Sequence, residues 1–262
     1  MDLNLSGKKA LICGSSDGIG KAAAEEIARM GASVTLLARN PEKLEKVKSQ
    51  LSTAHGQQHQ ILVADFDDLV GLESELSAHL RAGNDYNILV NNSGGPPAGP
   101  AHKAGLEEYV TAFRRHLLAN QLISQALLEG MRKSGYGRII NVISTSVKAP
   151  LPNLGVSNTI RGAVANWSKT LSRELGPDGI TVNNVLPGAT ETLRLTSIIS
   201  NKAQKTGKSE AEVSAEMTSE IPLARFAKPE EVANAIAFLA SPSAAYISGI
   251  NVPVDGGRTP NL

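Results

Sequence analysis

Short apolar segments alternate with longer helical patterns along nearly the whole chain, and this alternation limits the folds that the sequence can adopt. Helical patterns include a long one over residues 106–133 and another over 158–175. The predicted strands cover residues 8–13, 33–37, 61–64, 87–90, 138–143, 180–186 and 250–254. Short buried strands joined by helices form a parallel sheet that is covered on both faces. We therefore predict a doubly wound α/β fold with a seven-stranded parallel sheet.

A glycine-rich turn follows the first predicted strand and opens the first helix. Its residues are Gly14, Ser15, Ser16, Asp17, Gly18, Ile19 and Gly20. Glycine lets the backbone turn sharply and approach a pyrophosphate, and the helix N-terminus that follows offers free N–H groups. Because the turn stands between a strand and a helix, it predicts dinucleotide binding by a single Rossmann-type domain over residues 1–262.

The residues after the second predicted strand indicate which dinucleotide is bound. An acidic residue here accepts hydrogen bonds from a free ribose hydroxyl, whereas Arg39 offers a permanent cation and forked donors to a 2′-phosphate. Arg39 and the adjacent Asn40 therefore favour NADP(H). The charge of Asp17 near the adenosine end argues for NAD(H), and Arg39 could also be a surface residue before a helix.

The amino-acid composition limits the kinds of partner that the protein can bind and the cellular compartment in which it works. Lys and Arg number 26 against 25 Asp and Glu, and 3% of residues are aromatic, so nothing favours a nucleic acid. No uncharged apolar run approaches the ~18 residues of a membrane span. Cys13, the single cysteine, suits a reducing compartment. We expect a soluble cytoplasmic protein without a membrane partner and, because His and Cys do not cluster, without a metal site.

A polar, helix-prone stretch near residues 192–221 interrupts the alternation. Ser209 and Glu212 within it have the spacing of a capping box. The stretch follows a strand whose carboxyl end should face the ligand crevice. We expect residues 193–221 to form a helical lid over the substrate, although a solvated pair of surface helices fits the same pattern.

Several ordered motifs resemble those of the short-chain dehydrogenase/reductase family, and the resemblance covers nearly the whole chain. Residues 91–94 (Asn-Asn-Ser-Gly) resemble the family's Asn-Asn-Ala-Gly, and residues 187–192 its Pro-Gly…Thr element. The resemblance implies that residues of these two motifs contact the dinucleotide, and that residues 65 and 66 contact its adenine end. The residues implied to bind the dinucleotide are Asp65, Phe66, Asn91, Ser93, Gly94, Pro187, Gly188, Thr190 and Thr192.

The C-terminal segments 248–251 and 254–257 resemble the last strand of that family, which implies a homotetramer or a homodimer. The overall similarity is closest to bacterial members described as 3-oxoacyl-carrier-protein reductase-like. That description covers many substrates, so the resemblance implies a small carbonyl or alcohol substrate without identifying it.

The family's Tyr-x-x-x-Lys motif is altered here. Ser144 matches the family's serine, and Asn120 matches its helix asparagine, which anchors a proton-relay water. The usual spacing then places Ser157 and Arg161 in the tyrosine and lysine positions, and no tyrosine falls in a segment expected over the site. A serine hydroxyl is a weaker acid than a phenol and is shorter. An arginine, with a pKa above ~12, cannot pass protons as a lysine relay can.

Three interpretations of this site follow. In the first, the chain is an NADP(H)-dependent oxidoreductase in which Ser144 and Ser157 hold a carbonyl, Arg161 stabilises the oxyanion and a water on Asn120 supplies the proton. In the second, it binds the cofactor without turnover, as a sensor or interaction protein. In the third, Ser157 is a helix N-cap and Arg161 a structural ribose clamp, and the chemistry takes place elsewhere. His116, one turn before Asn120, is expected to be a packed or interface residue, with a supporting role as the alternative.

Overall fold

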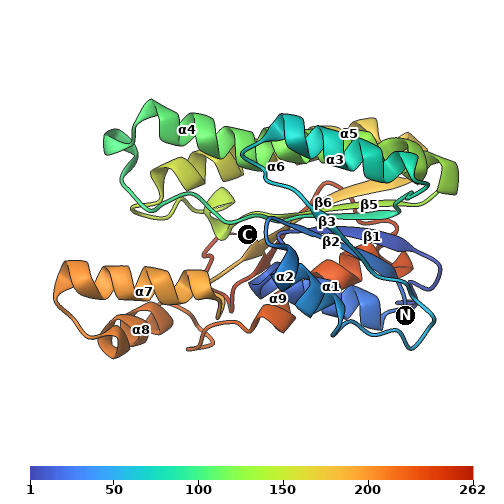
Figure 1. Ribbon diagram of the computed structural model, residues 1–262. Helices are drawn as coiled ribbons and strands as arrows, with labels where there is room; N and C mark the ends of the chain where they lie inside the picture. Colours follow the sequence, from blue (N-terminus) through green and yellow to red (C-terminus); the bar gives the residue numbers. More distant parts are fainter. Residues whose placement is uncertain (262) are drawn as a thin grey trace.

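One parallel sheet forms the centre of the computed structural model, which describes residues 1–261 (Figure 1). Its order is β3-β2-β1-β4-β5-β6-β7, and every neighbouring pair is parallel. The strands are β1 (Lys9–Cys13), β2 (Ser33–Ala38), β3 (Gln60–Val63), β4 (Ile88–Asn91), β5 (Gly137–Val142), β6 (Ile180–Pro187) and β7 (Asn251–Val254). The predicted fold class is confirmed, and each predicted strand end lies within one residue of the observed one.

Helices cover both faces of this sheet (Figure 1). On one face lie α1 (Gly18–Arg29), α2 (Pro41–Lys48) and α9 (Pro229–Ala240). On the other lie α3 (Leu69–Arg81), α4 (Leu106–Phe113), α5 (Ala119–Ser134) and α6 (Gly155–Glu174). Residues of β1 alternate between the two layers, since Ala10 and Ile12 pack with α1 and α9 whereas Leu11 and Cys13 pack with α3 and α5. Burial on both sides explains why the central strands are mainly apolar, although buried polar residues such as Asn141 lie within them.

The long helix predicted over residues 106–133 is present as one continuous helical run over residues 106–134, but it contains an irregular turn in its middle. A π-helical turn (Arg114–Leu118) separates α4 from α5. Such a turn inserts one extra residue into the helix and is frequent at functional sites. The extra residue rotates the following helix by about 100° relative to the preceding one, and no residue type marks the insertion, so the sequence does not reveal it.

A row of asparagine side chains crosses four neighbouring strands. Asn91, Asn141, Asn184 and Asn251 are register partners on β4, β5, β6 and β7. Asn91 Nδ2 donates to Asn141 Oδ1 at 2.9 Å, Asn141 Nδ2 to Asn184 Oδ1 at 3.1 Å, and Asn184 Nδ2 to Asn251 Oδ1 at 2.7 Å. Because a one-residue slip would leave these amides unpaired, the row helps to define the strand register.

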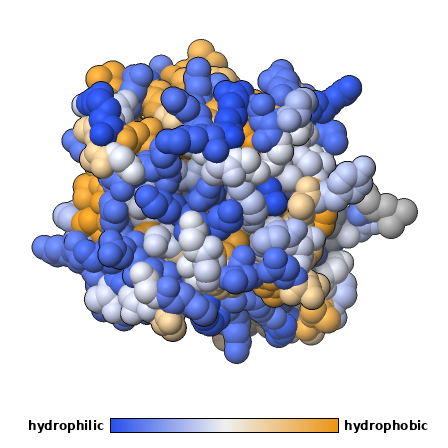
Figure 2. Space-filling view, turned by 90° about the vertical axis from the view of Figure 1, so that its right-hand side faces the viewer, coloured by the Kyte–Doolittle hydropathy of each residue, from blue (hydrophilic) through white to orange (hydrophobic). Residues whose placement is uncertain are grey.

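The surface view in Figure 2 shows a mainly hydrophilic face with scattered apolar groups. Among the helices of residues 1–261, none is long and apolar enough to cross a membrane.

Candidate cofactor-binding and active site

The glycine loop leaves room for a ligand only because it lacks side chains. Gly14 and Gly18 have φ angles of +59° and +54°, which residues with a Cβ rarely adopt. A Cβ on Gly20 would lie 2.2 Å from the carbonyl oxygen of Gly14. Asn92 Nδ2 donates to that same oxygen at 3.2 Å. This backbone cradle at the N-terminus of α1 fits the pyrophosphate of a dinucleotide.

Other residues of the loop hold its shape. The N–H and hydroxyl of the buried Ser15 donate to the Leu37 carbonyl at 3.4 and 3.5 Å. The carboxylate of Asp17 caps α1 by accepting from its first N–H at 2.6 Å. Ile19 packs onto the apolar core, and Ser16 is half-buried. The charge of Asp17, expected to act at the adenosine end, is thus engaged by the helix.

The predicted adenosine end carries an exposed ion pair. Arg39, with 70% of its side chain exposed, lies 3.7 Å from a carboxylate oxygen of Asp65. Asn40 caps α2, because its Oδ1 accepts from the N–H of Lys43 at 2.9 Å. Phe66 is buried beside this surface. Arg39 therefore lies outside helix α2, and its guanidinium is accessible to a phosphate.

A second ion pair at this end was not found by sequence reasoning. Both Asp67 carboxylate oxygens accept hydrogen bonds from Arg115 in the π-helical turn. The hydrogen bond from Arg115 holds the pKa of Asp67 below its usual value. The pair ties the loop after β3 to the helix break, and it joins residues 48 positions apart, beyond the reach of any local pattern.

The predicted catalytic residues gather where β5 ends and α6 begins. Ser157 lies in the first turn of α6, whose N-cap is Leu154, so the interpretation of Ser157 as an N-cap is wrong. Arg161 follows one turn later on the same face, and both side chains are buried. Arg161 Nη1 donates to the carbonyl of Val142 at 3.2 Å. Ser144 opens a 3-10 turn directly after β5 and accepts from a backbone N–H two residues later at 3.1 Å.

Arg161 places an uncompensated cation in this site. Burial, together with the nearby positive charge of Arg194, lowers its pKa to about 10, so the guanidinium remains protonated at neutral pH. No carboxylate within residues 1–261 forms an ion pair with Arg161 or Arg194. A buried cation without a counter-ion can stabilise negative charge that develops on a bound substrate.

His116, one turn before Asn120, makes a side-chain contact that Asn120 lacks. Asn120 is buried on α5, and its amide makes no hydrogen bond within the described residues. His116 in the π-helical turn is 1% exposed, and its Nδ1 lies 2.8 Å from the hydroxyl of Ser93. Burial, followed by the charge of Arg161, lowers the pKa of His116 to about 2. The sequence interpretation favoured a packing role and did not anticipate this contact.

The carboxyl end of β6 lies against the glycine loop. A Cβ on Gly18 would be 3.0 Å from Cγ2 of Thr192. Thr192 caps the next helix, and the buried Thr190 donates to the carbonyl of Gly188 at 3.1 Å. Pro187 ends β6 and thereby directs the chain into this turn. The structure thus brings the predicted cofactor residues from the two halves of the sheet together.

The loop after β4 completes the crevice. Gly94 is exposed, and a Cβ there would meet no atom within 4 Å. The side chain of Asn91, also predicted to contact the cofactor, is buried in the asparagine row. Any contact between this residue and a dinucleotide would therefore involve its backbone.

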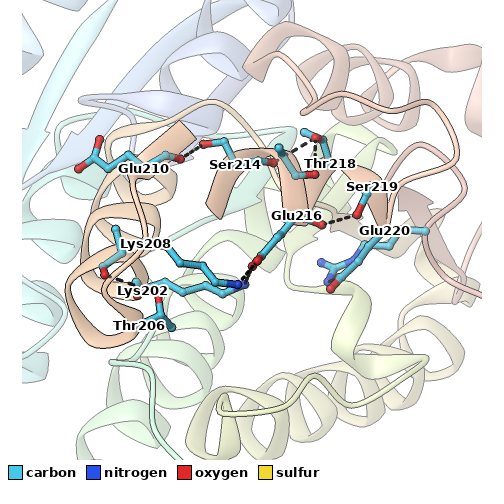
Figure 3. Close-up of polar contacts among 12 residues, drawn as sticks. Lys202, Thr206, Lys208, Glu210, Ser214, Glu216, Thr218, Ser219 and Glu220 are labelled. Carbon is cyan, nitrogen blue, oxygen red and sulfur yellow. Dashed lines mark hydrogen bonds and ion pairs between the residues drawn. The ribbon is translucent and has the colours of Figure 1, made fainter. Parts of the chain in front are cut away.

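The expected lid consists of α7 (Leu193–Thr206) and α8 (Glu210–Ser219), which project to one side of the sheet (Figure 1). The capping box of Ser209 and Glu212 is confirmed. In Figure 3 the carboxylate of Glu216 meets both Lys202, at 3.4 Å, and Lys208. Leu195, Ile199, Ala203 and Val213 form the apolar contact between the two helices.

A single arginine ties this helix pair to the loop after β4. The guanidinium of Arg194 donates to the carbonyls of Gly95 at 2.7 Å and Pro96 at 3.0 Å. A Cβ on Gly95 would lie 2.8 Å from Nη2 of this guanidinium, so a side chain here would force the guanidinium to shift. Sequence reasoning missed this contact, which joins residues almost 100 positions apart.

Comparisons with known proteins agree with this geometry. The sequence profile of the family described as Enoyl-(Acyl carrier protein) reductase matches residues 14–259. The 3-oxoacyl-(acyl-carrier-protein) reductase FabG of Vibrio cholerae is 34% identical over 257 residues, which are 97% of this chain and 98% of that protein. The NADPH-dependent reductase BacG of Bacillus subtilis is 30% identical, with 98% and 100% of the two chains covered.

Among solved structures, the L-sorbose reductase of Gluconobacter frateurii, complexed with NADPH and L-sorbose, superposes with a TM-score of 0.93. It is 32% identical, and both chains are covered completely. The profile match, these relatives and the sheet order agree over nearly the full length. The chain therefore belongs to the short-chain dehydrogenase/reductase family.

Proposed function

We propose that the protein is an NADP(H)-dependent oxidoreductase that acts on a small carbonyl or alcohol substrate through an altered active site. The observation that carries this proposal is the buried Arg161 guanidinium, one helical turn from Ser157 and without a carboxylate partner. Relatives described as reductases, one of them complexed with NADPH, support the same reaction class. The glycine cradle and Arg39 would hold the dinucleotide.

Each side chain has a separate role in the proposed reaction. The bound dinucleotide supplies or accepts the hydride. The hydroxyls of Ser144 and Ser157 donate hydrogen bonds to the substrate carbonyl, and Arg161 stabilises the negative charge on its oxygen. Asn120, whose amide is free, holds a water near the site. The helix pair α7–α8, anchored by Arg194, serves as the lid that excludes bulk water.

Turnover with a panel of ketones, aldehydes and diketones tests this function. We expect purified protein to oxidise NADPH with at least one activated carbonyl, and Ser144→Ala to lower kcat at least ~100-fold, the usual cost of removing an oxyanion donor. In Ser144→Ala, the dissociation constant of NADPH should differ from that of the wild-type protein by less than threefold. Ser172→Ala, at the far end of α6, is the matched control and should keep full activity. NADPH left unconsumed across the whole panel would refute the reductase proposal.

The second candidate is a protein that binds the cofactor without turning it over, and two of the four tyrosines favour it because their hydroxyls are engaged elsewhere. The hydroxyl of Tyr86 donates to Thr35 at 2.8 Å, and that of Tyr136 to the Ala240 carbonyl at 2.6 Å, so neither phenol is free. In the same panel, the double change Ser157→Tyr with Arg161→Lys separates the two candidates. If this double variant consumes NADPH while the wild-type protein does not, the result would support the binding role.

We also propose that the protein is a homo-oligomer, as its C-terminal strand suggested. The π-helical turn and α4 expose Val110, Phe113 and Leu118, which border a hollow together with Tyr109 and Ile160. An apolar patch of this kind is typical of a subunit interface.

Sedimentation should give the mass of a dimer or a tetramer, because association would bury this patch. Phe113→Glu, which puts a charge into the patch, should shift the mass toward one chain. Val70→Glu, a change of the same kind at an exposed apolar residue of α3, is the control. A wild-type protein with the mass of one chain would contradict the assignment.

A further inference from the structure

His116 and Ser93 form a polar contact that the proposed function does not use. His116 lies in the π-helical turn, and Ser93 lies in the half-buried loop after β4. The imidazole Nδ1 and the serine Oγ are 2.8 Å apart. The other ring nitrogen, Nε2, is buried and has no hydrogen-bond partner within the described residues. A buried polar atom without a partner is costly, so such atoms call for a functional or solvent explanation.

The charges around His116 are all positive. Arg161 on α6, Arg115 in the same turn and Arg194 on α7 each oppose protonation of the ring, and burial opposes it further. The imidazole is therefore neutral and has one N–H and one lone pair. Such a ring can take up a proton on one nitrogen and release one from the other without ever carrying a lasting charge.

The position of the contact suggests a route for protons. Ser93 is half-buried in the loop after β4, whereas His116 is buried and lies close enough to Arg161 to be affected by its charge. The π-helical turn and α6 are in contact. Ser157, which replaces a stronger acid, cannot itself replenish a proton that it gives away. The site therefore needs a connection to solvent.

We propose that Ser93 and His116 form the proton route that connects solvent to the active site. This inference rests on the proposed reductase function. In the reducing direction, hydride reaches the carbonyl carbon and the C=O π electrons become a lone pair on the substrate oxygen. That oxygen takes the proton of His116 Nε2, directly or through the water on Asn120. Nδ1 takes the hydroxyl proton of Ser93, and Ser93 takes a proton from solvent. One solvent proton is consumed for each hydride transferred.

Kinetics of three variants test this route, with the wild-type protein measured first. His116→Phe fills the space but carries no proton, so kcat should fall at least ~100-fold while the dissociation constant of NADPH stays within threefold. Ser93→Ala should lower kcat about tenfold, because a water can replace the hydroxyl only in part. The control is His79→Phe on α3, where the ring contacts the Tyr86 hydroxyl at 2.6 Å; its kcat should be unchanged.

Two further readouts do not depend on the rate alone. The dependence of wild-type kcat on the D2O fraction should be curved, as several protons in transit require, and should become linear in His116→Phe, where no proton passes through the ring. The imidazole ¹⁵N resonances of His116, assigned by their loss in His116→Phe, should report a neutral ring that does not titrate between pH 5 and 8.

The outcomes separate the route from the function on which it rests. Wild-type protein without turnover defeats the reductase proposal and, with it, the route. Wild-type turnover that persists in His116→Phe, or that falls equally in His79→Phe, overturns the route alone. An His116 resonance that titrates near the ordinary imidazole pKa of ~6.5 also overturns it, because the ring would then act as a cation.

Discussion

Replacing Gly20 by alanine is expected to lower the affinity for NADPH by at least ~100-fold, or about 2.7 kcal/mol. The added Cβ would lie 2.2 Å from the carbonyl oxygen of Gly14 and 2.7 Å from Nδ2 of Asn92. One neighbour is backbone, and the other is already hydrogen-bonded to that backbone. The loop must therefore open, and the cradle for the pyrophosphate is lost with it. Titration of NADPH fluorescence measures the effect.

Gly162→Ala is the matched control for this change. Gly162 lies inside α6, and a Cβ there meets no atom within 4 Å. Alanine should leave NADPH affinity unchanged and raise the free energy of unfolding by about 0.5–1 kcal/mol, the ordinary gain of alanine over glycine in a helix. Unchanged NADPH affinity in Gly20→Ala would show that the loop is not the binding site.

The change Arg39→Asp should invert the dinucleotide preference, shifting the NADPH-to-NADH affinity ratio by at least ~100-fold. In the native protein the accessible guanidinium of Arg39 lies 3.7 Å from a carboxylate oxygen of Asp65. The variant would place two carboxylates at the adenosine end. They would repel the 2′-phosphate of NADPH and accept hydrogen bonds from the free ribose hydroxyl of NADH. Titrations with both dinucleotides give the ratio.

Salt and a second charge reversal identify the origin of this preference. The guanidinium is exposed, so the native preference for NADPH should weaken as ionic strength rises. Arg29→Asp on α1 makes the same change in net charge at a guanidinium that pairs with Glu26. It should leave the ratio unchanged. An equal shift in both variants would attribute the preference to overall charge rather than to Arg39.

Patterns that repeat along the chain were readable from the sequence. The strands were found within one residue because most of them contain a short buried apolar run, as Leu11 and Ile12 of β1 illustrate, whereas the edge strands β3 and β7 are only partly buried. The capping box at Ser209 and Glu212 was readable because its partners lie three positions apart. The turn from β1 into α1 was readable because its glycines are required by local backbone geometry.

Features that depend on helical phase or on distant partners were not readable. One inserted residue at the π-helical turn selects His116 rather than Asn120 as the partner of Ser93, and no residue type signals that insertion. The contact of Arg194 with the Gly95 carbonyl exists only once the two loops meet in the folded chain. The roles of Ser144, Ser157 and Arg161 in turnover remain predictions, although the structure brings these residues to one end of the sheet.

The asparagine row has a consequence for the newly made chain. β7 supplies the last acceptor of the row, Asn251. Until the ribosome has released that segment, β6 presents an unpaired edge, and Asn184 lacks its acceptor. Open edges of this kind recruit strands from other chains. A nascent protein that stalls before residue 251 should therefore depend on chaperones far more than the finished one.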